Sequence, residues 1–240
     1  MAEITEDSTL YLPGRGQSYI TTLSSPVQLS DSWQYEMAVI QFFCPSGFQS
    51  VYDGHLEFYS KKENKMITTK LPPGYYTSAA QLLEILQNAL EASTYEVNLS
   101  VEGKFTITLN DAKAQVKLSP NLAAMLGGFP QNFKHSFSAE QKWDSSGGNS
   151  ILYITCDCVQ LSNFGDEKAK ILGAVPMFQS MRGIDETVSF QPARPVYVPL
   201  YSRQISSVSL EFKNQNGDPF PMHGGSVLCV LHIRPSKPDL

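Results

Sequence analysis

The C-terminal stretch of the chain constrains its fold more than any other segment. Residues 207–235 read SVSLEFKNQNGDPFPMHGGSVLCVLHIRP, which is a strand-like segment, a polar turn and a second strand-like segment. The second segment is apolar at almost every position, and one of its faces would carry Val227, Cys229, Leu231 and Ile233. Apolar residues on both faces are typical of a strand that is covered on both sides. The sequence therefore predicts a C-terminal strand paired inside a sheet.

Similar strand-like runs make up most of the chain, the first of them at residues 18–23. They are rich in Val, Ile, Thr, Tyr and Phe and are separated by Gly, Pro, Asn or Ser. Among the 240 residues, 42% are hydrophobic and 17% are charged, as in an ordinary globular protein with a sizeable core. Many short strands joined by turns predict an all-β sandwich or barrel-like architecture.

Two predicted helices interrupt the β pattern. Ser78 can cap the first, with Gln81 three residues on, as a capping box requires. Five residues form an apolar stripe along this helix: Ala79, Leu82, Leu83, Leu86 and Leu90. We expect this stripe to face the core rather than to form a partner-binding groove. The second helix would follow Ser119, begin at Pro120 and end before Gly127.

The positions of these helices predict the domain organisation. Residues 1–69 would supply the N-terminal strands of the main β domain. Residues 70–133 would form a βαββα-type subdomain inserted into it, and residues 134–150 a polar linker rich in Ser and Gly. Residues 151–240 would then complete the same β domain.

The residues able to carry chemistry show no recognisable catalytic or metal-binding pattern. Cys156 and Cys158 are separated by one residue, whereas zinc knuckles and redox pairs use two. We interpret them, together with Cys44 and Cys229, as free thiols in the core of a protein from a reducing compartment. The chain lacks a P-loop, a G-x-S-x-G elbow, a dinucleotide fingerprint and an H-E-x-x-H motif. We therefore expect no catalytic, cofactor-binding or metal-binding residues, no cofactor and no enzyme activity.

Charge and hydropathy exclude two further classes of function. The formal net charge is −5 and no dense run of Lys and Arg occurs, so direct binding of nucleic acid is not expected. The N-terminal residues lack the pattern of a signal peptide, and no apolar run approaches the roughly 18 residues of a membrane span. Synthesis in the cytosol is the expectation that follows.

Four stretches together resemble one viral protein family. Residues 24–51 resemble its opening strands, and residues 71–90 (LPPGYYTSAAQLLEILQNAL) its Pro-Gly-Tyr turn and helix. Residues 116–129 (VKLSPNLAAMLGGF) resemble its Ser-Pro-x-Leu-Ala-x-x-Leu-Gly signature, and residues 195–235 its Tyr-Val-Pro segment and closing hairpin. In this order and spacing, the stretches resemble the minor capsid, or penton, protein of Polinton/Maverick elements and adintoviruses.

The resemblance implies a single jelly roll, five copies of which close each fivefold vertex of an icosahedral dsDNA virus or virus-like transposon capsid. It implies a homopentamer as the assembly and the major, double jelly-roll capsid protein as a partner. It also implies a place in the virion capsid after synthesis in the host cytoplasm, with assembly there or in the nucleus. It assigns no interface residues. The alternative from another class is a β-rich receptor-binding or fibre-head module.

The predicted C-terminal strand leads to a truncation experiment. Full burial of its large aliphatic side chains is worth roughly 1.5–3 kcal/mol each. The sum is comparable with the whole stability of a domain, about 5–15 kcal/mol. Truncation after Gly225 is therefore expected to abolish folding, whereas removal of residues 236–240 should leave the fold intact. Thermal unfolding followed by circular dichroism checks this, and a soluble, cooperatively melting protein from the longer truncation would contradict it.

Overall fold

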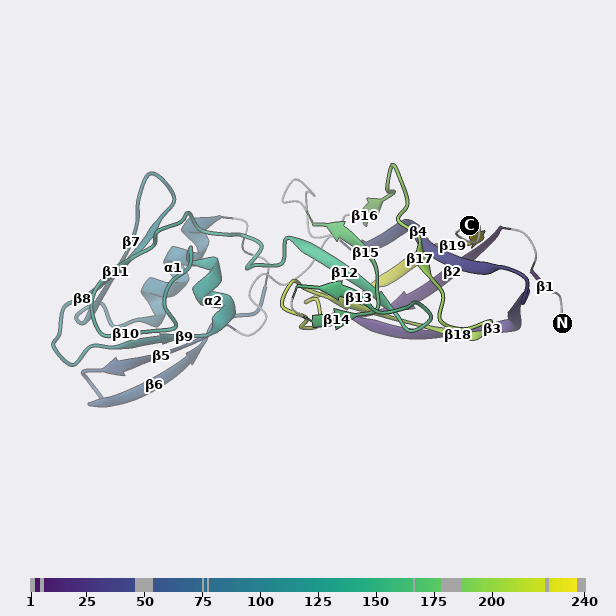
Figure 1. Cartoon of the computed structure of the whole chain (residues 1–240). Coiled ribbons are helices and arrows are strands. Elements are labelled where there is room, and N and C mark those ends of the chain that lie inside the picture. The colour runs from purple at the N-terminus through teal and green to yellow at the C-terminus, as the bar shows by residue number, and fades with distance from the viewer. Residues whose placement is uncertain are drawn as a thin grey trace. The chain divides into compact units, whose positions relative to one another are not determined.

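The chain divides into two compact units (Figure 1). The computed structural model describes residues 3–4, 7–45, 54–74, 76, 78–165, 167–177, 187–222 and 225–236. The first unit, called the sandwich unit below, comprises Met1–Gly47 and Ser150–Leu240. The second, called the inserted unit, comprises Phe48–Asn149.

The sandwich unit contains two main sheets. The first, called the β19 sheet, has the order β16 (Thr187–Phe190), β4 (Gln34–Pro45), β19 (Ser226–Ser236) and β2 (Ser8–Arg15). The second, called the β18 sheet, has the order β3 (Ser18–Leu29), β18 (Gln204–Lys213), β12 (Ile151–Cys156) and β15 (Ile171–Pro176). All pairs among these eight strands are antiparallel.

Short strands extend both sheets. At the β18 sheet, β1 (Glu3–Ile4) pairs in parallel with β3. At the β19 sheet, β17 (Val198–Pro199) pairs with β4. The connection from β12 to β15 contains a small hairpin of β13 (Ser162–Phe164) and β14 (Glu167–Ala169).

The order in which the chain visits the two sheets defines the fold. β2 lies in the β19 sheet, β3 in the β18 sheet and β4 in the β19 sheet again. After the inserted unit come β12 and β15 in the β18 sheet, then β16, β18 and β19 in alternating sheets. Two four-stranded antiparallel sheets connected in this order form a jelly roll. The predicted fold class, an all-β single jelly roll with an inserted α+β subdomain, is confirmed.

The C-terminal strand β19 lies between β2 and β4, as the sequence predicts. Its Cys229, Leu231 and Ile233 are completely buried. On the other face Val230 is 1% exposed, so this face is covered as well. Between the sheets, the rings of Phe42 on β4 and Phe212 on β18 pack with their centroids 5.4 Å apart. β19 therefore contributes to the centre of the sandwich core.

The sequence analysis does not predict strand β2. Pro13 and Gly14 in its second half are typical of a loop, but β2 is an edge strand, where a proline is tolerated. Gly14 is needed for packing, because a Cβ there would lie 2.2 Å from the ring of Tyr19. Tyr19 in turn donates a hydrogen bond from its hydroxyl to the Leu12 carbonyl oxygen, at 2.8 Å. Gly14, which makes the segment look like a loop in the sequence, thus allows β2 to pack against Tyr19 at the start of β3.

The inserted unit has its own hydrophobic core between sheets and helices. One sheet has the order β10 (Asn132–Phe133), β9 (Val116–Leu118), β5 (His55–Ser60) and β6 (Lys65–Lys70). The other has the order β11 (Phe137–Ser138), β8 (Phe105–Leu109) and β7 (Tyr95–Leu99). The helices are α1 (Ala79–Ala89) and α2 (Pro120–Met125), and neither is long and apolar enough to cross a bilayer.

Both helices form where the sequence predicts them. The Ser78 hydroxyl accepts a hydrogen bond from the Gln81 N–H at 3.3 Å, so the predicted N-cap of α1 is confirmed. Leu82 and Leu86 are completely buried, which confirms the apolar stripe as core. Ser119 precedes α2 but makes no side-chain cap, and its hydroxyl instead accepts from the His55 N–H at 3.4 Å.

The structure differs from the sequence analysis at both borders of the insertion. The sequence analysis places residues 54–69 in the jelly roll, but β5 pairs with β9 and β6 pairs with β5, inside the inserted unit. The sequence pattern of an amphipathic hairpin is the same in either unit. The unit to which it belongs is identified only by the strand with which it pairs. The insertion therefore carries an additional strand pair ahead of the predicted βαββα elements.

The segment interpreted as a linker also belongs to the inserted unit. The Asp144 N–H donates to the Met125 carbonyl oxygen at 2.8 Å, and the Asp144 carboxylate accepts from the N–H groups of Ser146 and Gly148. Ser146 and Asn149 are 3% and 1% exposed. Ser, Asp, Asn and Gly are favoured in flexible linkers and in hydrogen-bonded turns alike, and here they build a buried turn.

The internal core of the inserted unit predicts that residues 54–149 fold when expressed alone. The fragment should unfold cooperatively, and Leu86→Ala should lower its free energy of unfolding by about 2–5 kcal/mol, because the side chain is completely buried. Val101→Ala, at a fully exposed position, is the matched control and should leave the stability unchanged. Chemical denaturation measures both, and a fragment without a cooperative transition would contradict the prediction.

Candidate functional site

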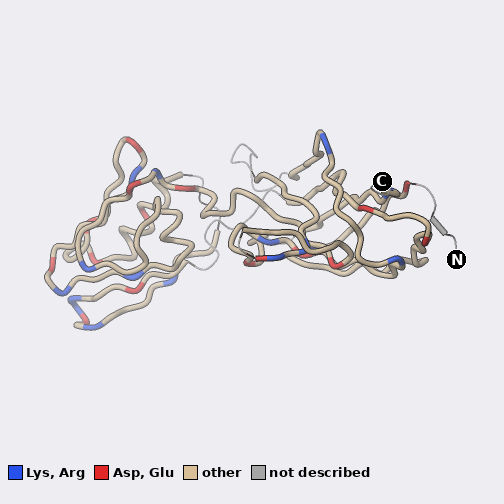
Figure 2. Tube along the Cα trace, in the orientation of Figure 1, with Lys and Arg blue, Asp and Glu red and all other residues tan. Residues whose placement is uncertain are grey.

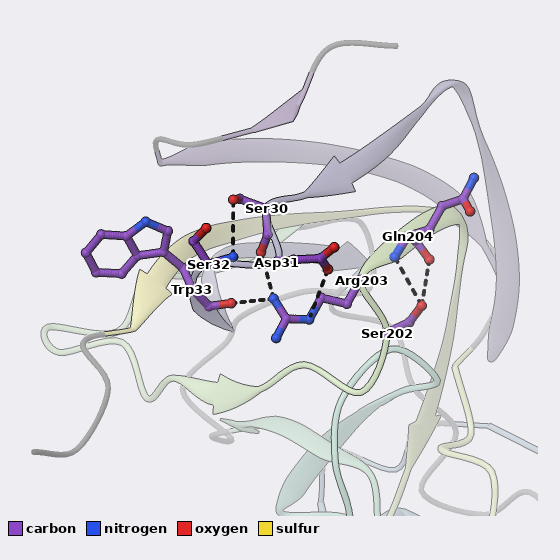
Figure 3. Close-up of polar contacts among 7 residues, drawn as sticks. All are labelled: Ser30, Asp31, Ser32, Trp33, Ser202, Arg203 and Gln204. Carbon is purple, nitrogen blue, oxygen red and sulfur yellow. Dashed lines mark hydrogen bonds and ion pairs between the residues drawn. The ribbon is translucent and has the colours of Figure 1, made fainter.

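One end of the jelly roll is held together by the guanidinium group of Arg203 (Figure 3). Its Nη1 donates to the carbonyl oxygens of Ser30 and Trp33, at 2.6 Å each, and its Nε lies 4.0 Å from Asp31 Oδ1. The Arg203 carbonyl oxygen accepts from the Leu29 N–H at 2.9 Å. Arg203 thus ties the turn between β3 and β4 to the start of β18.

Three exposed apolar side chains lie on the backbone segments that meet at this end. Trp33, Leu161 and Tyr201 are 43%, 60% and 77% exposed, and they are called the loop-end surface below. Their segments are joined by the Arg203 contact to Trp33 and by the Tyr201 N–H, which donates to the Cys158 carbonyl oxygen at 2.7 Å. The Trp33 indole points away from the arginine (Figure 3). Aromatic side chains are enriched at protein interfaces, which makes these exposed positions candidate contact residues.

A polar network on the outer face of β19 holds the segment that leads to β17. The Tyr197 hydroxyl lies 2.8 Å from His232 Nδ1, and the Arg234 guanidinium lies 3.5 Å from the centroid of the Tyr197 ring. Arg234 Nε donates to Glu36 Oε1 at 2.6 Å, a contact that raises the pKa of Arg234. His232 is thus a packing residue in this network, and its Nε2 lies 3.6 Å from Asp7 Oδ2.

The four cysteines are buried and free of disulfides, as predicted. Burial raises the pKa of the Cys44 thiol to about 12 and also raises the pKa of Cys229. The hydrogen bond with Cys156, followed by burial, raises the pKa of Cys158. Because only the thiolate is strongly nucleophilic, these environments make the thiols of Cys44, Cys158 and Cys229 unreactive near neutral pH.

The structure adds a third group to Cys156 and Cys158 that their spacing does not reveal. Cys158 Sγ lies 3.3 Å and Cys156 Sγ 3.9 Å from Asp157 Oδ1. The same oxygen accepts a hydrogen bond from the Ser209 N–H at 2.9 Å. Two thiols and one carboxylate thus converge where β12 ends, a group called the Cys-Asp-Cys cluster below. Asp53, Asp185 and His223 lie outside the described residues.

A groove of about 900 Å³ adjoins this cluster. Its lining comes from β12, from β18 and from the segment that contains the β13–β14 hairpin, and it includes Cys156 and Asp157. The rings of Tyr153 and Phe164 meet edge to face, with centroids 4.8 Å apart, and both line the groove. Lysines and acidic residues both contribute to the lining, so the groove has no single sign of charge: Asp157, Glu167, Lys168, Lys170, Glu211 and Lys213.

Charges of both signs alternate along the described part of the chain (Figure 2). The segment with the highest density of lysines, residues 61–65, also contains Glu63, which pairs with Lys65 at 2.8 Å. A surface that binds nucleic acid needs clustered positive charge to neutralise phosphates. In the described part of the chain, this segment therefore carries a pair of opposite charges rather than positive charge alone.

The fold defines a single-jelly-roll protein with an α+β unit inserted between β4 and β12. No protein-family model matches the chain, and no curated protein matches its sequence. Among solved structures, the crystal structure of the mavirus penton protein is similar, with a TM-score of 0.46 and 9% sequence identity. The similarity covers 95% of this chain and 100% of that one. At this distance it assigns no function.

The cysteine environments predict the outcome of a thiol titration. At pH 8 the folded protein should react slowly with a disulfide reagent, because all four thiols are buried and burial raises the pKa of Cys44 and Cys229. In denaturant, without reductant, all four thiols should react. Absorbance of the released reagent anion measures both rates. Fast modification of the native protein, or fewer than four thiols in denaturant, would contradict this assignment.

Proposed function

We propose that the protein is a structural capsid protein of the penton type, which closes the fivefold vertices of an icosahedral dsDNA virus or virus-like transposon of the Polinton, Maverick and adintovirus kind. The observation that carries the proposal is the jelly roll itself, completed by β19 between β2 and β4. Jelly rolls are a recurrent architecture of viral capsid proteins, although lectins and cupins share it. The choice of a capsid protein over a lectin or a cupin therefore rests on the sequence motifs.

The four stretches that resemble the penton family lie at positions that determine the fold. The first covers the turn held by Arg203 and strand β4. The second contains the Ser78 cap and helix α1, and the third contains β9 and α2. The fourth contains β17, β18 and β19. Because each motif specifies a local structure of this fold, their joint occurrence supports a shared architecture with that family.

The proposed assembly is a ring of five copies in the virion capsid, in contact with the major double jelly-roll capsid protein. Closed cyclic rings of more than two subunits use heterologous contacts, in which one surface meets a different surface of the next copy. The loop-end surface offers exposed apolar side chains for such a contact, and Trp and Tyr are enriched at the centres of protein interfaces. We propose a neighbouring copy as its occupant.

Native mass spectrometry and electron microscopy of the purified protein at high concentration test this function. A pentamer, alone or on co-expression with a double jelly-roll capsid protein, is the expected result. The double variant Trp33→Ser/Tyr201→Ser should weaken the ring while the melting temperature stays unchanged, since both side chains are exposed. Val101→Ser, at an exposed apolar position of the inserted unit, is the matched control.

Two outcomes would contradict the proposal. A trimer would favour the receptor-binding or fibre-head alternative, because such modules are commonly threefold. A protein that stays monomeric and does not enter particles on co-expression would exclude a role in the shell. A pentamer unaffected by the double variant would keep the function and exclude the loop-end surface as the contact between copies.

A further inference from the structure

We propose that the Cys-Asp-Cys cluster of Cys156, Asp157 and Cys158 binds one divalent cation of the zinc class. The sequence analysis expected no metal site, because the cysteines lack the usual spacing. Among the described residues, the structure brings the two Sγ atoms and a carboxylate oxygen within 4.8 Å of one another. Thiolates and carboxylates are both established zinc ligands.

The two sulfur–oxygen separations in the cluster match those that tetrahedral coordination requires. With Zn–S bonds near 2.3 Å and Zn–O bonds near 2.1 Å, a tetrahedral angle separates sulfur and oxygen by about 3.6 Å. The observed separations from Asp157 Oδ1 are 3.3 Å for Cys158 Sγ and 3.9 Å for Cys156 Sγ, on either side of that value. The two Sγ atoms lie within 4.8 Å of each other, whereas tetrahedral Zn–S bonds would place them about 3.8 Å apart. Binding would therefore draw the sulfur atoms together by at most about 1 Å.

The surrounding structure holds these donors in place. Cys156 ends β12, and its partner across the sheet is Leu210 on β18. Asp157 is fixed by the Ser209 N–H, which donates to its Oδ1, and by its own N–H, which donates to the Ser209 carbonyl oxygen at 3.2 Å. The Cys158 carbonyl oxygen accepts from the Tyr201 N–H, so the last ligand is tied to the segment before β18. Ligands held this way are preorganised for binding.

The groove beside β12 gives a cation access to the cluster. Cys156 and Asp157 belong to its lining, so the fourth coordination position can be taken by water from this side. Three protein ligands plus one water is an established zinc arrangement. The site would lie wholly within the sandwich unit, and its existence does not depend on the capsid function.

Metal binding at this cluster must release protons. Each cysteine would exchange its S–H bond for an S–metal bond, and the two protons would pass to solvent while no group is oxidised or reduced. With two protons released, the apparent affinity should rise by up to about 100-fold for each pH unit in the neutral range.

Titration of the full-length reduced protein with Co²⁺ tests the proposal, because thiolate ligands give a charge-transfer absorption that carboxylate and imidazole ligands do not. The expected result is saturation at one equivalent, with that band present and with stronger binding at higher pH. Native mass spectrometry in the presence of Zn²⁺ should show the mass of one ion. Absence of the band, or cobalt bound without it, would overturn the proposal.

Variants locate the bound ion. Cys158→Ser should abolish the charge-transfer band, and Asp157→Asn should weaken binding at least tenfold while an amide oxygen still accepts from the Ser209 N–H. Cys44→Ser is the matched control, because this thiol is also buried but lies on β4 outside the cluster. Circular dichroism establishes whether each variant is folded. If Cys158→Ser unfolds, Asp157→Asn still tests the site. Loss of the band in Cys44→Ser, or its retention in Cys158→Ser, would place the ion elsewhere and overturn the proposal.

Discussion

The pairing of β19 with both β2 and β4 is the constraint on which the sandwich unit depends. β2 and β4 are not neighbours in the sheet, and only β19 joins them. Its pairs with β2 run from Ser226↔Arg15 to Ile233↔Ser8, and its pairs with β4 extend to Ser236↔Gln34. The sheet is therefore incomplete until the last strand of the chain is in place. Such long-range pairings are slow to form, because the loop between the partners must close first.

The inserted unit does not interfere with the pairing of β19 with β2 and β4, because it has its own core and its strands pair with one another. Its helices and strands share one core cluster, and its strands pair with one another. It enters the jelly roll at a single connection, between β4 and β12. A self-contained insertion at a loop leaves the pairing of β19 undisturbed, since loops tolerate long insertions at a modest entropic cost.

The sequence predicts those features that a local pattern specifies. The two-sided apolarity of β19 and the Ser78 cap with its stripe on α1 are visible in a few consecutive residues, and both are confirmed. β2 was missed because Pro13 and Gly14 resemble a loop, and only the ring of Tyr19 explains the glycine. The borders of the insertion were misplaced because the partner of β5 is β9, about 60 residues further on. A single sequence does not encode such pairings locally.

The candidate sites depend even more on distant residues. Arg203 lies far along the chain from the carbonyl groups of Ser30 and Trp33 that it binds, so no local motif predicts the contact. The sequence analysis identifies the pair of Cys156 and Cys158, but their unusual spacing gives no reason to consider Asp157 as a third ligand. Asp157 joins the thiols because Ser209 holds its carboxylate at the end of β12. The signal that could have found it is the sequence Cys-Asp-Cys itself, in which each residue can ligate a metal.

Hydrogen exchange of the full-length protein, resolved by residue or short peptide, tests the central role of β19 most directly. If the sandwich unit is closed by this strand, the amides of β19 should exchange together with those of β4. They should be among the slowest of the unit and should exchange only through its global unfolding. Faster exchange in β19 than in β15, the last strand in the described order of the β18 sheet, would show that the C-terminal strand opens locally. The jelly roll would then not depend on its closure.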